Sequence, residues 1–480
     1  MGPEISEARR ENWRVLKENG MLAGATDDDS THDTAAFAER FGDRTRDPTD
    51  AQVVLVGRVR AIRDHGYLTF FDIEDRSGST QLFFDADHTD GYEYTDNVDV
   101  GDIARAVGEP MWTNSGDLAL KTREFGVVSK SFVHVPSDEP LNPETRLRQP
   151  ELAMWVDDLN DVLETRFGVV RTMRNHLDDR GFTPVETPVL HRHYNGGYSD
   201  PFETEWDADG SRRVLRITME LHLKRLVVGG YERVYEIDRI FRNGDEGRMH
   251  YPERTNLELI QSYADYEDMM DLTESMILDI VDRWSDGQDR LVPFEGGQLD
   301  FSPPWPRLTV TDGLEKRAGL DVENMTDEEI VELASAEGLE CTDRARGELV
   351  LGLFKKHVAS EIDDPVFVID HPRETAPLCA LHRDDDTRVE RAGLWAGGLK
   401  LTDAFTEGRD PLGLLSRMTD QLERRRRRVD GEVQINDEFV EALGYGMPPA
   451  GGLAVSVDRL VMLLTDRSAV KWVLPFPMTA

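Results

Sequence analysis

Three arginine-bearing segments of this sequence could bind and neutralise an anionic substrate. Arg242 ends a strand-like run that enters a charged loop, and Arg459 lies at the start of an apolar helix. Arginine presents a rigid fork of donors that suits carboxylate and phosphate groups, and a helix N-terminus adds a dipole that favours anions. Taken singly, each arginine could instead form a surface salt bridge. The third segment, ERRRRR at 423–428, is interpreted as a solvated helix face, with contact to a nucleic-acid backbone as the alternative.

The chain is strongly acidic along its whole length. Its 480 residues include 94 Asp and Glu against 56 Lys and Arg, which gives a formal net charge of −38. Because 39% of the residues are hydrophobic, the chain is not a disordered polyanion. A carboxylate-rich surface stays soluble at high salt, where screening weakens its self-repulsion. We therefore expect a salt-adapted protein, with mimicry of a nucleic acid as the alternative.

Several classes of protein are excluded by what the sequence lacks. It has no run of about 18 apolar residues, so we expect no membrane-spanning helix. The first residues lack the apolar segment of a secretory signal. Cys341 and Cys379 do not form a CxxC pair, so we expect neither a disulfide framework nor a zinc site. These features together favour a cytoplasmic location.

The N-terminal part of the chain carries the pattern of a small β-barrel. Residues 51–136 alternate apolar and polar positions, with turn signals at 64–66 and 76–78. Five or six short strands are predicted, and the OB-fold is a common barrel of this size. Residues 1–50 are expected to hold a short helix and an acidic segment, and residues 137–150 a proline-containing linker.

Residues 151–480 are predicted to form a larger α+β domain. An amphipathic helix is expected over roughly 155–179, and a second helix over 268–285. Strand-like runs outnumber crossover helices, which indicates a mainly antiparallel sheet with flanking helices. An acidic helical insertion is expected at about 321–362. Further strand-like runs are RVLRIT, RVYEIDRIF, NLELIQSYA and PVFVID.

The order of these segments resembles the class II aminoacyl-tRNA synthetases, and the lysyl-tRNA synthetases in particular. GFTPVETPVL resembles motif 1, RVYEIDRIFRN resembles motif 2 and GGLAVSVDRLVMLL resembles motif 3. The intervening text is similar to the lysine branch in LRITMELHLKRLVVGG, PVFVIDHPRETAPLCALHRDD, LTDAFTEGRDP and EALGYGMPPAGGL. The similarity covers nearly the whole chain.

This resemblance implies an anticodon-binding OB barrel, a catalytic antiparallel sheet of six or seven strands, and a homodimer built through motif 1. It implies that lysine and ATP form an aminoacyl-adenylate, which then acylates a tRNA with a lysine-type anticodon. Attack of a carboxylate on the α-phosphate needs positioning and charge neutralisation more than covalent catalysis. Clustered arginines suit that chemistry.

The resemblance also implies roles for individual residues. Arg242 would bridge the substrate carboxylate and the α-phosphate, Arg459 would hold the ATP tail, and Glu407 would receive the ε-ammonium group. Further ATP contacts would be Glu246, Arg248 and His250. Further amino-acid contacts would be Gly197, Glu220, Glu258, Asp403 and Phe405. The anticodon would be bound by Arg63, Phe70 and Gln81, with Glu124 a weaker match. Packing alone is the alternative for Glu258, Phe405 and Phe70.

Departures from the family pattern cluster in the ATP site. The two acids that hold magnesium in the family correspond to Gly393 and Lys400, so magnesium is expected with ATP but its protein ligands are predicted to be lost. Lys400 could neutralise phosphate in the metal's place. Asp403 stands where the family has asparagine and is predicted to repel a substrate carboxylate. The other departures are Gly244, Arg254, Ile260, Ala454 and Ser456.

These departures leave two alternatives to a lysine–tRNA ligase. One is a diverged paralogue that uses another amine-bearing amino acid or an acceptor other than tRNA. The other is a tRNA-binding protein without catalytic activity.

Overall fold

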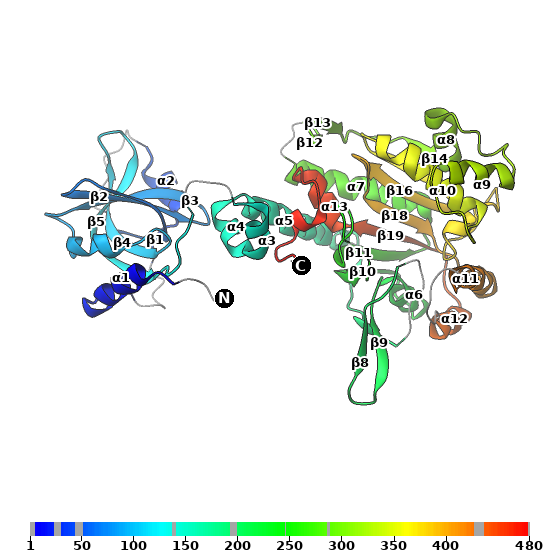
Figure 1. Cartoon of the computed structure of the whole chain (residues 1–480), viewed down its shortest axis with the longest axis horizontal. Coiled ribbons are helices and arrows are strands. Elements are labelled where there is room, and N and C mark those ends of the chain that lie inside the picture. The colour runs from blue at the N-terminus through cyan, green and yellow to red at the C-terminus, as the bar shows by residue number, and fades with distance from the viewer. Residues whose placement is uncertain are drawn as a thin grey trace. The chain divides into compact units, whose positions relative to one another are not determined.

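The computed structural model describes residues 5–23, 30–43, 51–136, 141–192, 199–244, 246–285, 289–426 and 436–478. The chain divides into two compact units, Met1–Pro140 and Leu141–Ala480 (Figure 1). Within the described residues, no helix is long and apolar enough to cross a membrane.

The first unit is a closed barrel of five strands, as the sequence predicts. Its strand order is β1-β2-β3-β5-β4, and β1 pairs with β4 to close it. Phe71 and Ile73 of β2, and Leu82 and Phe84 of β3, are fully buried at alternate positions, because successive side chains of a strand face opposite sides. The strands are β1 (Val53–Asp64), β2 (Leu68–Asp75), β3 (Gly78–Asp85), β4 (Ile103–Trp112) and β5 (Leu118–Ser129). Two helices, α1 (Glu7–Glu18) and α2 (Thr34–Phe41), belong to this unit.

The second unit is built on one mixed sheet, which confirms the α+β class. The sheet has nine strands in the order β14-β15-β16-β18-β19-β11-β10-β6, with β17 paired to β16. The β14–β15 and β10–β6 pairs are parallel and the other pairs are antiparallel. Their bounds are β6 (Thr183–Pro184), β10 (Arg233–Phe241), β11 (Glu253–Ser262), β14 (Arg307–Thr309), β15 (Val366–Pro372), β16 (Arg388–Ala396), β17 (Leu399–Lys400), β18 (Thr402–Thr406) and β19 (Ala450–Ser456).

The sheet therefore has more strands than the six or seven that the resemblance implies. The expectation is wrong because β6, β14 and β17 contain only two or three residues each.

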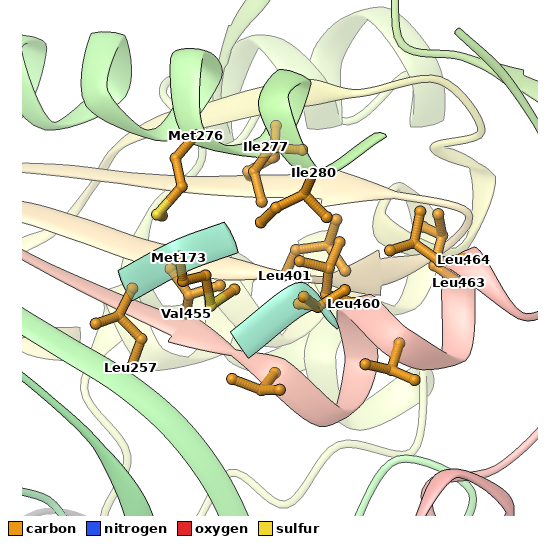
Figure 2. Close-up of a cluster of buried hydrophobic side chains, with 14 of the residues drawn as sticks. Met173, Leu257, Met276, Ile277, Ile280, Leu401, Val455, Leu460, Leu463 and Leu464 are labelled. Carbon is orange, nitrogen blue, oxygen red and sulfur yellow. The ribbon is translucent and has the colours of Figure 1, made fainter. Parts of the chain in front are cut away.

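Three helices cover one face of this sheet and form the main core: α5 (Leu159–Asp178), α7 (Tyr266–Trp284) and α13 (Val457–Leu464). Figure 2 shows Met173, Met276 and Leu460 of these helices directed towards Leu257 and Val455 of the sheet. The helix expected over roughly 155–179 corresponds to α5, which begins at Leu159 after a separate short helix, α4 (Pro150–Val156). The chain breaks at 157–158, where the side chain of Asp157 accepts a hydrogen bond from the backbone NH of Asp158 at 2.9 Å instead of continuing the helix.

The other face of the sheet carries α6 (Glu220–Val228) and α12 (Asp437–Gly444), which pack in a separate apolar cluster. The expected insertion holds α9 (Asp327–Ala336) and α10 (Arg346–His357), which pack with α8 (Val310–Ala318) beside β15 (Figure 1). The remaining helices and strands are α3 (Pro143–Arg148), β7 (Leu190–His191), β8 (Glu203–Trp206), β9 (Ser211–Leu215), β12 (Leu291–Phe294), β13 (Gly297–Asp300) and α11 (Pro411–Arg426).

A buried ion pair fixes the start of α13. Arg166 donates to Asp458 at 2.7 Å and to the hydroxyl of Thr255 at 2.8 Å, and Asp458 accepts the backbone NH of Thr255 at 3.0 Å. Both charged side chains are at most 4% exposed. Removing one partner of such a pair costs about 3–5 kcal/mol, because the other charge stays buried. The pair therefore holds α5, β11 and α13 together and positions Arg459.

Candidate functional site

The candidate active site is a cleft of about 300 Å³ on the central strands of the catalytic sheet. Most of the lining residues of β11, β18 and β19 are at alternate positions, while residues between them, such as Leu257 and Ala404, pack in the main core. Strand pairing places the cleft residues in two rows, Phe405–Gly452–Ile260 and Asp403–Ala454–Glu258. Gly452 is required for close approach, because a Cβ atom there would lie 2.3 Å from Oε1 of Glu407.

One end of the cleft is a carboxylate cluster that already contains a cation. Nζ of Lys224, on α6, lies 2.6 Å from Oε1 of Glu220 and 2.5 Å from Oε2 of Glu407. The side chains of Lys224 and Glu407 are each 1% exposed. Burial acts to lower the pKa of Lys224, but the two carboxylates outweigh it and hold that pKa above its ordinary value. Lys224 therefore remains an ammonium group at neutral pH.

Lys224 was not expected as a site residue. The only signal in the sequence is its spacing of four residues from Glu220, which allows an ion pair on a helix. Nothing in the sequence links it to Glu407, which is far along the chain. Glu407, which is expected to contact a substrate ammonium group, therefore also contacts the internal ammonium group of Lys224.

Glu407 still has capacity to bind a ligand. Its Oε2 atom lies 2.5 Å from Nζ of Lys224, whereas its Oε1 atom has no hydrogen-bond partner among the described residues. Burial raises the pKa of Glu407 to about 8, against the lowering effect of Lys224. Burial also raises the pKa of Glu258, which accepts hydrogen bonds from Thr218 at 2.8 Å and the NH of Met219 at 2.9 Å.

The charges at this end suit a substrate with two ammonium groups. Glu220, Glu258 and Glu407 can carry three negative charges, and Lys224 neutralises one of them. When all three carboxyl groups are ionised, the cluster therefore keeps two negative charges that Lys224 does not compensate. An unpaired ammonium group in a closed pocket is costly, so such a cluster selects for ligands that supply the missing cations.

The other end of the cleft is cationic. Arg242, Arg254, Arg459 and Lys400 all line it. Nη1 of Arg459 donates to the backbone carbonyl of Lys400 at 2.9 Å. Burial lowers the pKa of Arg254 to about 10, and the positive charges of Arg242 and Arg459 contribute. This end is therefore suited to an anion such as a phosphate chain.

Two cations contact Asp403, the residue that the sequence predicts to repel a substrate carboxylate. Nε and Nη2 of Arg391 donate to its carboxylate at 2.8 and 2.5 Å, and Nζ of Lys400 lies 3.0 Å away. Burial acts to raise the pKa of Asp403, but these two cations hold it far below its ordinary value. Arg391 and Lys400 offset the negative charge of Asp403, and its repulsion of a substrate carboxylate stays a prediction.

The structure brings seven of the predicted residues into this one cleft: Arg242, Arg459, Glu220, Glu258, Asp403, Phe405 and Glu407. Gly197 lies outside the described residues. Glu246 and Arg248 are not among the lining residues, since Arg248 pairs with Glu295 and Glu246 lies 3.7 Å from Lys471. His250 is exposed and does not line the cleft, and desolvation together with the positive charges of Arg254 and Arg459 lowers its pKa.

The barrel carries a second pocket, of about 580 Å³, which is lined by Arg63, Phe70 and Gln81. Asp72 organises it: Nη1 and Nη2 of Arg63 each donate to its carboxylate at 2.6 Å, and Nε2 of Gln81 donates at 3.2 Å. Asp72 was not expected, although it lies two residues after Phe70 on β2 and so faces the same side. Glu124 is not among the lining residues and lies 3.9 Å from Arg105.

Comparison with known proteins agrees with this geometry. Residues 142–480 match the family model described as tRNA synthetases class II (D, K and N), and residues 53–128 match an OB-fold nucleic acid binding domain. A lysine–tRNA ligase from Moorella thermoacetica is 36% identical over 99% of this chain and 97% of its own length. The chain belongs to the class II lysyl-tRNA synthetase family.

Other members of this family are similar over comparable lengths. A lysine–tRNA ligase from Saccharolobus solfataricus is 35% identical over 96% of this chain and 95% of its own length. A lysine–tRNA ligase from Enterococcus faecalis is 34% identical over 98% of this chain and 96% of its own length. The similarity thus includes both the barrel and the catalytic unit.

Proposed function

We propose that the protein is a lysine–tRNA ligase, which activates lysine with ATP and transfers the lysyl group to tRNA. The observation that carries this proposal is the division of one cleft into a carboxylate end and a cationic end. Glu220, Glu258 and Glu407 would bind the two ammonium groups of lysine, and Arg242 and Arg459 would bind its carboxylate and the phosphates of ATP. Similarity to lysine–tRNA ligases over nearly the whole chain supports this assignment over the alternative acceptors.

The reaction follows from this arrangement. A carboxylate oxygen of lysine attacks the α-phosphorus of ATP, the bond to the β-phosphate oxygen breaks, and pyrophosphate leaves. Arg242 belongs to the cationic end of the cleft and would offset the negative charge that develops on the α-phosphate. A ribose hydroxyl at the tRNA 3′ end then attacks the carbonyl carbon, and AMP leaves.

The acids of the cleft do not fit a magnesium ion held by the protein. Glu220 and Glu407 hold Lys224, and Asp403 is bound by Arg391 and Lys400. Within the part of the chain that the structure describes, no group of three or more His, Cys, Asp or Glu side chains is placed to hold a metal ion. We propose that the family's metal ligands are lost here, and that magnesium enters only as the counter-ion of ATP.

We predict that lysine binding weakens as the pH falls below about 8. Glu407 must be ionised to receive an ammonium group, and its pKa without ligand is about 8. The protein therefore releases a proton on binding below this pH, and the affinity falls by up to about tenfold per pH unit. Calorimetric titration of lysine in buffers of different ionisation enthalpy measures both the affinity and the released proton. A flat affinity between about pH 6 and pH 8, with no proton released, contradicts the prediction.

Recognition of tRNA is expected to depend on stacking in the barrel pocket. Phe70 lies 5.2 Å from the ring of Phe83 and 5.9 Å from His65, at the edge of the pocket. Stacking on an aromatic side chain contributes about 1–3 kcal/mol per base, so Phe70→Ala should weaken tRNA binding by about tenfold or more. Filter binding of the tRNA and the rate of lysylation measure this effect.

Phe132→Ala is the matched control, because Phe132 is a half-buried aromatic of the same unit that packs on Trp13 away from the pocket. It should leave tRNA binding unchanged, and neither variant should alter lysine-dependent ATP–pyrophosphate exchange, which needs no tRNA. Equal losses in both variants would show that the pocket does not bind the anticodon.

The cellular setting is also a proposal. A homodimer built through the motif 1 segment is inferred from the family resemblance, and a cytoplasmic location is inferred from the sequence features and is consistent with the free cysteines Cys341 and Cys379. The net charge of −38 supports adaptation to high salt, so assays belong in concentrated potassium chloride.

A further inference from the structure

The end of the Lys400 side chain lies in the space next to a glycine. It lies on the short strand β17, beside Gly393 of β16. A Cβ atom at position 393 would lie 2.8 Å from Cε of Lys400 and 3.5 Å from its Nζ. Glycine weakens a strand interior and often marks a close approach of another group. Gly393 and Lys400 therefore form one packing unit, in which the missing side chain makes room for the lysine.

Neighbouring groups hold the Lys400 ammonium in the cleft. Nζ lies 3.0 Å from Oδ1 of Asp403, and Arg391 binds the same carboxylate. The backbone carbonyl of Lys400 accepts the hydrogen bond from Arg459 at 2.9 Å. The lysine side chain is still 22% exposed and lines the cleft. It is thus oriented by its surroundings while its ammonium group can still reach a ligand.

The charges around Lys400 favour a bound anion. Burial lowers its pKa to about 8, opposed by Asp403 and assisted by Arg391 and Lys355. A buried neighbour, His371, also has a pKa lowered by burial and by this group of cations. The single negative charge of Asp403 offsets only one of the two positive charges, Arg391 and Lys400, that are in contact with it. Together with Arg242, Arg254 and Arg459, this end of the cleft keeps a clear excess of positive charge, which a phosphate chain would neutralise.

We propose that Lys400, seated over Gly393 and oriented by Asp403, binds the triphosphate of ATP directly and, with Arg254, takes over charge neutralisation at this end of the cleft. This inference rests on the proposed function only in taking ATP as the nucleotide. It explains several departures from the family pattern as one coordinated set. Lys400 replaces an acid, Gly393 gives it space, Asp403 orients it, and Arg254 adds charge.

ATP binding by the full-length protein in concentrated potassium chloride, measured by calorimetry in EDTA and in magnesium chloride, tests this inference. The wild-type protein should bind ATP in EDTA within about threefold of its affinity with magnesium. Lys400→Met should weaken ATP binding in EDTA by about tenfold or more, since a hydrogen bond to a charged group is lost. Adenosine, which lacks phosphates, should bind both proteins equally.

Two further variants separate a phosphate contact from a structural role. Lys400→Arg keeps the charge and should retain most of the ATP affinity in EDTA. Lys316→Met removes a lysine that pairs with Asp312 on the exposed surface of α8, and should change nothing. Thermal unfolding verifies that each variant is folded.

Two outcomes would overturn the inference. One is an ATP affinity of the wild-type protein that is about a hundredfold lower in EDTA than in magnesium chloride. The other is an equal loss of ATP and adenosine affinity in Lys400→Met. Neither outcome depends on lysine or tRNA, so failure here is distinct from failure of the proposed ligase activity.

Discussion

Replacing Arg242 with alanine is expected to reduce lysine-dependent ATP–pyrophosphate exchange by about 10³-fold. Arg242 follows the end of β10 and lines the cleft that also holds Glu258 and Arg459. There it can contact the attacking carboxylate and the α-phosphate together, and removal of one donor to a developing oxyanion costs about 10²–10³ in rate. The loss should appear in kcat more than in the KM for lysine, because the interaction strengthens in the transition state.

Arg239→Ala is the matched control for this variant. Arg239 belongs to the same strand, but it lies 3.3 Å from Glu253 and does not line the cleft. Its replacement should leave exchange within about twofold of the wild-type rate, because exposed ion pairs contribute little. If Arg242→Ala retains wild-type exchange while folded, the cleft is not where the adenylate forms.

Replacing Glu407 with glutamine should reduce kcat/KM for lysine by about 10²-fold or more. The carboxylate is buried beside Phe405 and Lys224, and it is placed to bind a second ammonium group. Loss of one partner from a buried charge pair costs about 2–5 kcal/mol. The effect should fall mainly on KM, and the substituted pocket should lose the proton release on lysine binding, because Glu407 is the group that titrates near pH 8.

A second buried carboxylate controls for the loss of stability. Glu236 is 4% exposed and pairs with Arg216 at 2.7 Å, but it does not line the cleft. Glu236→Gln should lower the thermal unfolding midpoint without changing KM for lysine. If both variants raise KM equally, the effect of Glu407→Gln is structural and Glu407 does not recognise the substrate.

Much of this architecture could be predicted from the sequence because it depends on local patterns. Alternation of apolar residues predicts the barrel, since Phe71 and Ile73 face its interior while Phe70 and Asp72 face away. The apolar run after Arg459 predicts α13 with the arginine in its first turn. Both features extend over a whole element, so the periodicity is strong.

The charge partners inside the cleft could not be predicted in this way. Lys224 and Glu407 lie far apart in the chain, and only the packing of α6 on the sheet, against β10 and β11, brings their charges together. The ion pairs of Asp403 could not be predicted for the same reason, because they depend on whether Arg391 and Lys400 reach it in the fold. Sequence comparison identifies residue types at a position, whereas ion pairing is a property of the tertiary arrangement.

The most direct test of the account is ATP–pyrophosphate exchange at high potassium chloride with each of the standard amino acids in turn. The cleft combines carboxylates for two ammonium groups with arginines for a carboxylate and phosphates. The account predicts exchange with lysine well above that with arginine, aspartate or asparagine, and its loss in Arg242→Ala. Stronger exchange with another amino acid, or none with any while the protein is folded, would contradict it.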